Sequence, residues 1–148
     1  MSFNESKKVF MALKEFEADL SNMVNEMGNI AYNMTIDSFS KQGYTDKALI
    51  RWEPRKRTER GRGSRGILIG LGTGTAGLRG SYRKVKRGLL SISIINNKVY
   101  SGVHNEGLMA GRGTGFKMPE RRMIGDSQVM RTKIEKKINF RIKRIWRS

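Results

Sequence analysis

A regular stripe of apolar residues near the N-terminus most constrains the fold of this chain. Between residues 9 and 34, apolar side chains recur at alternating steps of four and three. That spacing places them on one narrow side of an α-helix and predicts a single long helix over residues 5–39. The stripe comprises Val9, Leu13, Phe16, Leu20, Met23, Met27, Ile30 and Met34. It has two candidate partners, which are the chain's own sheet and, for part of its length, a neighbouring subunit.

Charge is distributed unevenly along the 148 residues. Residues 1–50 have a net charge of −2, whereas the remaining residues carry +19, for a total of +17. An excess of this size in one part of the chain implies a polyanionic neighbour, most simply nucleic acid, or an acidic protein partner. A solvated basic surface is the alternative.

Composition excludes several classes of protein. The chain contains no cysteine, which rules out disulfides, thiolate zinc sites and cysteine nucleophiles. It has no run of 18 apolar residues, so we expect no membrane-spanning helix. The first residues do not combine a basic segment with an apolar one, so we expect no secretory signal. The length suits a single domain over residues 1–148.

Residues 40–66 interrupt the helical pattern. From residue 55 onward the segment is basic and glycine-rich and contains no apolar residue, so it cannot bury a core and should be a mobile loop. We call residues 55–66 the basic arm. Its cations, which could neutralise phosphates without reading bases, are Arg55, Lys56, Arg57, Arg60, Arg62 and Arg65. Trp52, just before the arm, fits packing better than stacking on a base.

Residues 72–77 match the G-x-G-x-x-G spacing of dinucleotide-binding loops. That motif requires a strand before it, a helix after it and an acidic residue about 20 positions further on. Here the following residues read as a strand, and residues 92–97 contain no acid. The same spacing recurs at residues 61–66, inside the basic arm, where no such fold can form. We therefore reject a nucleotide-dependent enzyme and expect no cofactor.

Residues 67–107 predict a small antiparallel sheet of three or four strands with helices on one face. Residues 67–71 are a short apolar strand candidate, and residues 90–94 alternate apolar side chains with serines, as in a half-buried strand. Asn96 and Asn97 suit a tight hairpin turn. The preceding strand should have a basic exposed face formed by Arg83, Lys84, Lys86 and Arg87.

His104 is the only histidine of the chain. A metal site needs several ligands, and acidic residues are too scarce around it to name a carboxylate pair or a Ser-His-Asp set. We therefore expect neither a metal nor catalysis at this residue. Two interpretations remain, which are a loop histidine hydrogen-bonded to the backbone and a subunit contact.

The chain ends with a glycine-rich loop over residues 108–118 and a predicted helix over residues 119–147. Ser127 stands where a helix cap is expected. Met130 and four isoleucines share one side of this helix, and the opposite side is basic. Its cations are Arg131, Lys133, Lys136, Lys137, Arg141, Lys143, Arg144 and Arg147. They exceed what the helix dipole requires, so this side should face a partner.

Two motifs in the second half of the chain resemble those of one protein family. In the phage virion morphogenesis and tail-completion family, an aromatic-small-x-x-His-x-x-Gly segment precedes a loop, and a Pro-x-Arg-x-Ile-Gly-x-Ser signature opens the last helix. The matching residues here are Tyr100, His104, Gly107, Pro119, Arg121 (or Arg122), Ile124, Gly125 and Ser127. Trp52 is similar to a loop tryptophan of the family, and the resemblance extends from Trp52 to Trp146.

Together the patterns predict an α+β fold with a long N-terminal helix, a small antiparallel sheet and a C-terminal helix, joined by long basic and glycine-rich loops. The resemblance implies a structural, non-enzymatic virion protein of a tailed phage. It would complete the neck or tail end and form a ring that joins tail to head. Before assembly it would be in the host cytoplasm.

The resemblance also implies partners. The chain would assemble with itself into a hexameric or dodecameric ring and contact neighbouring neck, connector or tail-tube proteins, with packaged DNA in the lumen. Its motif residues would then lie at subunit interfaces. Two alternatives remain, which are a tail terminator or head-completion protein of the same fold, and a sequence-nonspecific nucleic-acid-binding protein supported by charge alone.

Overall fold

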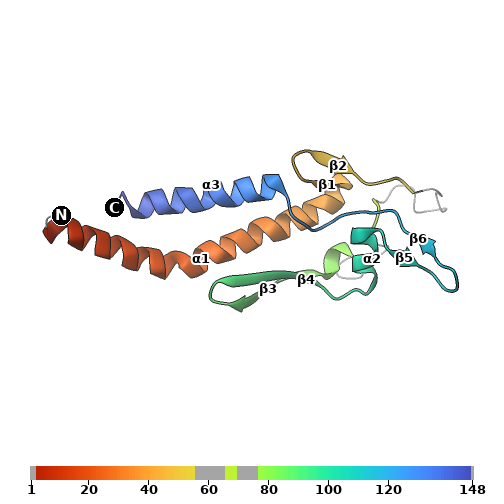
Figure 1. Cartoon of the computed structure of the whole chain (residues 1–148), viewed down its shortest axis with the longest axis horizontal. Helices are drawn as coiled ribbons and strands as arrows, with labels where there is room; N and C mark the ends of the chain where they lie inside the picture. Colours follow the sequence, from red (N-terminus) through yellow and green to blue (C-terminus); the bar gives the residue numbers. More distant parts are fainter. Residues whose placement is uncertain (1–2, 56–65, 70–76, 148) are drawn as a thin grey trace.

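Helix α1 (Phe3–Lys41) is the longest element and runs along most of the molecule (Figure 1). The computed structural model describes residues 3–55, 66–69 and 77–147. The helix ends where Gln42 adopts a left-handed backbone with a φ of 51°, because a right-handed helix cannot continue through that conformation. The predicted long N-terminal helix is confirmed, with slightly longer ends.

Helix α3 (Gln128–Ile145) lies beside α1 and runs antiparallel to it (Figure 1). Its N-cap is Ser127, whose side chain accepts a hydrogen bond from the Met130 backbone nitrogen at 3.1 Å. The predicted helix start at residue 119 is wrong, because residues 118–127 are not helical. Side chains from other parts of the chain hold the backbone of these residues and keep it from forming helical hydrogen bonds.

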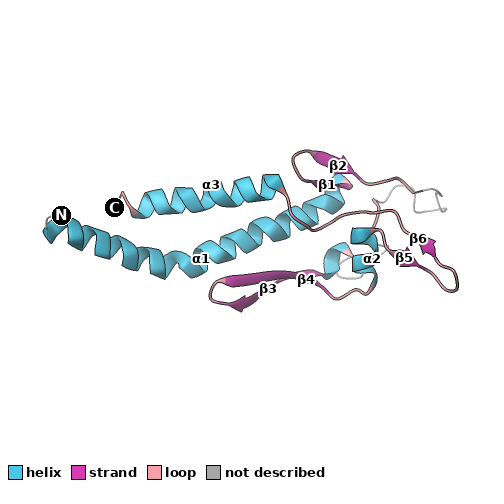
Figure 2. Cartoon of the chain, viewed as in Figure 1, coloured by secondary structure: helices cyan, strands magenta, loops and turns pink. Residues whose placement is uncertain are grey.

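Three separate antiparallel hairpins replace the single sheet that the sequence predicts (Figure 2). The pairs are β1 (Gly43–Thr45) with β2 (Leu49–Arg51), β3 (Tyr82–Gly88) with β4 (Ser91–Asn96), and β5 (Met109–Ala110) with β6 (Phe116–Lys117). The α+β class is confirmed, whereas the three- or four-stranded sheet is wrong. The β3–β4 hairpin packs on α1, so one of its faces is covered by a helix as expected.

The β3–β4 hairpin turns at Leu89 and Leu90, so the prediction of a turn at Asn96 and Asn97 is wrong. Asn96 ends β4, and its side-chain amide donates to the Leu78 carbonyl oxygen at 3.2 Å. The asparagine therefore anchors the open end of the hairpin rather than its turn.

Two segments predicted as strands take other conformations. Residues 100–106 form the short helix α2 (Tyr100–Glu106), where the sequence suggests the end of a strand. Residues 67–69 form a turn, and residues 70–71 lie outside the described part of the chain. A short apolar run is compatible with a strand, a helix or a turn, so its periodicity does not decide between them.

The two predicted loops contain the shortest hairpins. Strands β1 and β2 lie within residues 40–66, and β5 and β6 lie within residues 108–118. Strands of two or three residues are too short to show an alternating pattern. The rest of the predicted loop at residues 56–65 lies outside the described residues.

The buried core lies where the C-terminal end of α1 meets the two larger hairpins. It consists of Phe39, Trp52, Leu78, Tyr82 and Met123, each at most 7% exposed. The Phe39 ring meets the Trp52 ring edge-on, with 5.6 Å between their centroids. Such a contact adds roughly 1 kcal/mol to the burial of the two rings. These five residues come from parts of the chain far apart in sequence, so the core closes the fold.

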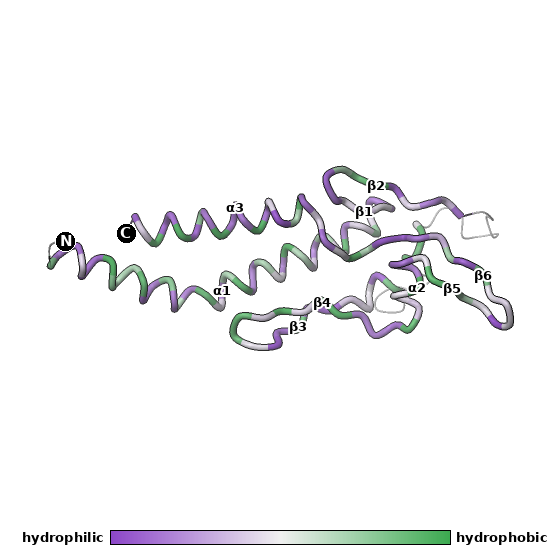
Figure 3. The backbone as a smooth tube through the Cα atoms, in the orientation of Figure 1, coloured by the Kyte–Doolittle hydropathy of each residue, from purple (hydrophilic) through white to green (hydrophobic). Residues whose placement is uncertain are grey.

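The apolar stripe of α1 is covered unevenly. Hydrophobic and hydrophilic residues alternate along both long helices (Figure 3). Met23 is buried with 6% exposure, but Leu13 is 52% exposed. Gly28 allows β4 to approach closely, because a Cβ atom there would lie 2.7 Å from the Cγ2 atom of Ile92. The chain's own elements cover part of the stripe, and a subunit contact along the rest stays a prediction.

An ion cluster joins α1 to α3 away from the core. Arg141 donates from Nη1 to the Asp19 carboxylate at 2.8 Å and from Nη2 to Glu26 at 2.5 Å. The hydrogen bond from Arg141 holds the pKa of Glu26 below its ordinary value of 4.5. Because this folded-state pKa is depressed, the stabilisation is present above pH 4.5 and is lost as the pH falls through the folded pKa.

We expect Arg141→Met to lower the melting temperature by several degrees, since Asp19 would lose its cation and Glu26 would keep only Lys137, at 3.7 Å. Thermal denaturation followed by circular dichroism measures the change. Arg144→Met is the matched control, because Arg144 is exposed on the same helix and makes no ion pair within the described residues. Equal melting temperatures for the two variants would show that the cluster does not hold the helices together.

Candidate functional site

The candidate site is the signature segment (residues 119–127), which connects β6 to α3. Side chains from three earlier positions hold its carbonyl oxygens. The indole nitrogen of Trp52 donates to Arg122 at 2.8 Å, and the hydroxyl of Tyr44 donates to Asp126 at 2.7 Å. The hydroxyl of Ser38 donates to Met123 at 3.2 Å. The end of α1, the β1–β2 hairpin and the residue after it therefore all hold this segment.

Asn105 on α2 holds the same segment from the other side. Its side-chain oxygen accepts hydrogen bonds from the backbone nitrogens of Met123 at 2.8 Å and Ile124 at 3.1 Å. The backbone nitrogen of Arg121 donates to the His104 carbonyl oxygen at 2.7 Å. The sequence analysis missed Asn105. Its only signal is an uncharged polar residue near the end of a motif, which is too common to single out.

Arg121 is a structural residue of the site. It is 6% exposed, and its guanidinium donates from Nε and Nη2 to the Glu53 carbonyl oxygen at 3.3 and 3.2 Å. Burial lowers the pKa of Arg121 from its ordinary value, and the nearby Glu53 carboxylate opposes that shift. Arg121 therefore joins the signature segment to the chain just before the basic arm.

Ser127 and Gly125 complete the C-terminal end of the segment. The Ser127 hydroxyl donates to the Thr45 carbonyl oxygen at 2.7 Å while it caps α3. A Cβ atom on Gly125 would lie 3.4 Å from the Tyr44 hydroxyl, which is an ordinary van der Waals contact. Ser127 is 1% exposed. The predicted cap is confirmed, and the same side chain fixes α3 against β1.

Gly107 and Pro119 bring α2 against the start of the segment. Gly107 ends α2 in the left-handed region with a φ of 64°. A Cβ atom there would lie 3.1 Å from the Met118 carbonyl oxygen and from the Glu120 nitrogen. Both the conformation and the space therefore favour glycine. Pro119 is half-buried between these two contacts.

His104 lies inside the fold with one ring nitrogen enclosed. Its Nδ1 atom is buried and has no hydrogen-bond partner among the described residues. Burial lowers the pKa of His104 below its ordinary value of 6.5, and the positive charge of Arg121 lowers it further. The Tyr100 ring meets the imidazole edge-on at 6.1 Å. The prediction of a loop histidine is wrong, because His104 lies in α2. Its carbonyl oxygen accepts a hydrogen bond from the Arg121 backbone nitrogen. A subunit contact at His104 stays a prediction.

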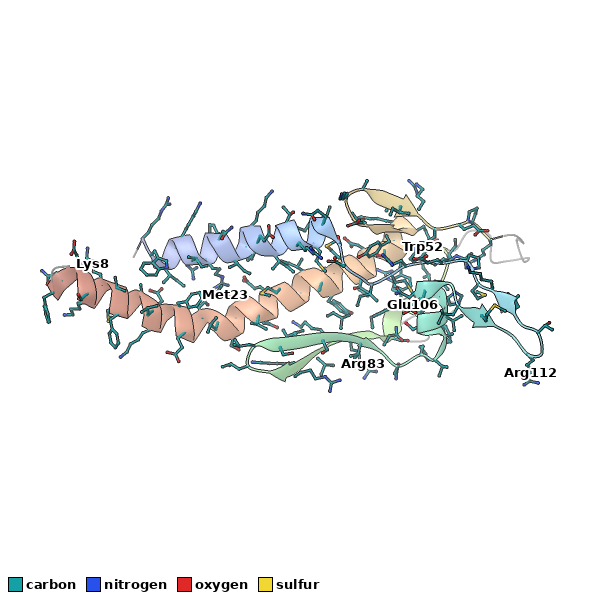
Figure 4. All side chains as sticks on the ribbon, in the orientation of Figure 1. Lys8, Met23, Trp52, Arg83, Glu106 and Arg112 are labelled. Atoms are coloured by element: carbon teal, nitrogen blue, oxygen red, sulfur yellow. The ribbon has the colours of Figure 1, made fainter. Side chains whose placement is uncertain are left out.

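The predicted basic face of β3 divides into two sets. Arg83 and Arg87 are exposed, and Arg83 points away from the body of the molecule (Figure 4). Lys84 and Lys86 instead reach α1, where Lys84 donates to Asn25 at 2.6 Å and Lys86 donates to Ser21 at 2.8 Å. Lys84 also bonds to Asn29. The two lysines therefore attach β3 to α1, and only the two arginines remain exposed for contact with another molecule.

The basic arm is described only at its edges. Arg55 donates from Nη2 to the Gly66 carbonyl oxygen at 3.0 Å, which brings the two ends of the arm together. The other predicted contacts of the arm lie outside the described residues, and they are Lys56, Arg57, Arg60, Arg62 and Arg65.

Helix α3 presents a basic stripe that the sequence analysis recognised only as part of a basic face. Three of the eight cations, Arg131, Lys137 and Arg141, pair with carboxylates. The other five are exposed and make no ion pair within residues 3–55, 66–69 and 77–147. They are Lys133, Lys136, Lys143, Arg144 and Arg147. Helical spacing puts the first four on one side of α3, and Arg147 follows in the turn just after the helix. We call this set of five the α3 basic stripe.

The described residues include neither a metal-binding cluster nor a membrane-spanning helix. None of their histidine, aspartate and glutamate side chains form a group of three or more that could hold a metal ion. None of their helices combines the length and apolarity needed to cross a bilayer. What the site does is to hold the last helix, the β1–β2 hairpin and α2 in one arrangement.

The fold and site define a small basic α+β protein whose motif residues bind its own backbone. The sequence model of the phage virion morphogenesis family matches residues 1–143, and the chain belongs to this family. This match confirms the family resemblance of the residues from Trp52 onward, and it also covers the residues before Trp52. The chain is a phage virion morphogenesis protein, and this family is a structural one. Comparisons with curated proteins and with solved structures gave no match.

Replacing Asn105 with alanine should destabilise the protein by about 2–4 kcal/mol, since it leaves two backbone N–H groups of the segment without an acceptor. Urea denaturation measures the free energy of unfolding. Asn97→Ala is the control, because Asn97 is exposed and should change stability little. If the two variants were equally stable, the side chain of Asn105 would not hold the segment.

His104 should make stability depend on pH. Its folded-state pKa lies below its ordinary value of 6.5, so the unfolded chain binds the proton more readily. The free energy of unfolding should therefore lose nothing to this group above pH 6.5, and it should decrease as the pH drops below that value. Denaturation of the wild type and of His104→Gln at a series of pH values tests this. The variant should lose the pH dependence near 6.5, and an unchanged profile would contradict the assignment, because the chain has no other histidine.

Proposed function

We propose that this virion morphogenesis protein completes the neck or tail end of a tailed phage, as a ring that joins the tail to the DNA-filled head. The family match over residues 1–143 is the observation that carries the proposal. Its location in the virion would be the neck or tail end. Its neighbours would be further copies, in a ring of six or twelve, and neck, connector or tail-tube proteins.

The signature segment supports a structural role of this kind. The motif residues Trp52, Arg121 and Ser127 are buried within one chain and hold this segment and α3 in place. In a subunit built in this way, the relative positions of the surface elements are fixed before assembly. A symmetric ring requires this, because every subunit makes the same contacts. Tyr100 is 43% exposed, so this motif residue has surface left for a neighbour.

Basic surfaces support a contact with packaged DNA. The α3 basic stripe and the exposed Arg83 and Arg87 supply cations that have no ion-pair partner in the described part of the chain. Cations of this kind bind phosphate backbones without reading sequence. The basic arm would add to them. The same stripe favours the second candidate, a free nucleic-acid-binding protein.

Inactivation of the gene in its phage, followed by electron microscopy of the particles, separates these candidates. We expect full heads to accumulate beside separate tails of normal length. Overlong tails would make the protein a tail terminator instead. Tails attached to heads that have lost their DNA would point to head completion. Ordinary infectious particles would remove the protein from the virion pathway and favour the free nucleic-acid-binding protein.

Complementation of the inactivated gene then tests the basic arm. A gene in which Arg55, Lys56, Arg57, Arg60, Arg62 and Arg65 are all glutamine should yield fewer infectious particles or less retained DNA, because the arm loses its charge. Wild-type titre and DNA content would show that the arm does not contact the genome.

A further inference from the structure

The side of α3 that carries the α3 basic stripe points away from α1 (Figure 4). Between positions 133 and 144, helical spacing places only five residues on this side, and all five are exposed. One of them is Phe140. The other four are the cations Lys133, Lys136, Lys143 and Arg144. Glu135 is the only acidic residue in this stretch, and helical spacing puts it on a different side of α3.

Phe140 lies in the middle of the stripe. Its side chain is 64% exposed, and its ring makes no aromatic contact within the described residues. Lys136 precedes it by four positions, and Lys143 and Arg144 follow it by three and four, so cations neighbour the ring on both sides along the helix. A single exposed aromatic residue is ordinary on a protein surface. This one is informative through its position, because every other residue on this side between 133 and 144 is a cation.

The charge pattern of the stripe fits a linear polyanion. At about 1.5 Å per residue, the row from Lys133 to Arg144 extends over about 17 Å. A nucleic-acid strand carries one phosphate per about 3.4 Å, so roughly five phosphates match that length. An acidic protein would have to supply an equally long row of carboxylates. Lysine, which provides three of the four cations on the helix, is also depleted in protein–protein interfaces.

Phe140 narrows the match to a strand with unpaired bases. In a duplex the base faces stack on one another, so the ring would meet only sugars and phosphates. A single strand exposes its base faces, and proteins bind it by stacking aromatic side chains on bases while cations neutralise the phosphates. A membrane surface fits less well, because an interfacial helix needs a broad apolar side. Between residues 133 and 144, Phe140 is the one apolar residue on this side.

We propose that the α3 basic stripe and Phe140 form a binding site for single-stranded nucleic acid. The cations contact phosphates along the strand, the ring stacks on a base, and Arg147 extends the row beyond the end of α3. The site reads no sequence, because every base has a face on which a ring can stack. This inference rests on the nucleic-acid contact proposed above for the stripe. It goes further by naming the form of the nucleic acid and the side chain that distinguishes it.

Fluorescence anisotropy of the full chain with two labelled probes tests the site. The probes are an oligothymidylate of about 15 nucleotides and a duplex of the same length. Phe140→Leu keeps an apolar side chain and a good helix former but removes the ring. It should weaken oligothymidylate binding about tenfold and leave duplex binding unchanged. Phe10→Leu is the matched control and should change neither, because Phe10 is 56% exposed but lies on α1, outside the stripe.

Two further variants separate the stripe from the general positive charge of the chain. One combines Lys136→Gln with Lys143→Gln, and the other combines Arg112→Gln with Lys117→Gln, so each loses two exposed cations. Arg112 and Lys117 belong to the β5–β6 hairpin, away from α3 (Figure 4). The stripe variant should lose about tenfold in oligothymidylate affinity at physiological salt, as expected for two lost phosphate contacts. The hairpin variant should lose less.

Equal losses in the two charge variants would overturn the site, because binding would then follow total charge. Oligothymidylate binding by Phe140→Leu at the level of the natural chain would also overturn it. If that variant still lowered the yield of infectious particles, the stripe would belong to a protein neighbour instead.

The site and the neck role can fail separately. Selective loss of oligothymidylate binding in Phe140→Leu, with ordinary particles after gene inactivation, would leave the site standing and overturn the neck role. Separate heads and tails after inactivation, with normal binding of both probes by Phe140→Leu, would leave the neck role standing and overturn the site.

Discussion

Hydrogen bonds from buried side chains to the backbone of residues 121–127 hold the rest of this structure in place. Among the described residues, five buried side chains form the central core. Trp52, Tyr44 and Asn105 bind peptide groups of the signature segment from different elements. Since an unsatisfied buried peptide group is costly, these bonds permit few alternative arrangements. They fix the direction in which α3 leaves.

A second set of polar contacts, separate from the signature segment, holds the two long helices together. Away from the core, α1 and α3 stay together through Arg141 and its two carboxylates and through the burial of Ile145. The β3–β4 hairpin is tied to α1 in a similar way by Lys84 and Lys86. Some of the cations that the sequence suggested for an external partner, namely Lys84, Lys86 and Arg141, therefore make contacts within the chain instead. Those that remain define the surfaces available for contact.

Membership of the phage virion morphogenesis family gives these surfaces a biological setting. The family motif builds the subunit, so its preservation in this chain follows from the need to position α3 and the β1–β2 hairpin. In the proposed virion role, contacts with neighbours would be made by other residues that are exposed, such as those of the α3 basic stripe. This division agrees with a protein that is rigid in its centre and is recognised by neighbours at its periphery.

The sequence by itself determined the features that depend on neighbouring residues. The spacing of apolar residues from Val9 to Met34 predicted α1, Ser127 was recognised as a cap, and motifs around His104 and Gly125 pointed to the family. Each of these signals is local, because helical periodicity and capping involve residues within a few positions of each other.

Only the tertiary structure decided how the peptide groups of residues 119–127 are satisfied, and therefore that this segment is not helical. It also decided that Lys84 faces α1 while Arg83 faces outward, and that the strands form three hairpins instead of one sheet. These outcomes depend on partners far away in sequence, such as Asn105 for Met123 and Asn25 for Lys84. Sequence pattern and composition do not identify such partners, because many polar side chains could make the same hydrogen bond and only the folded chain brings one of them into place.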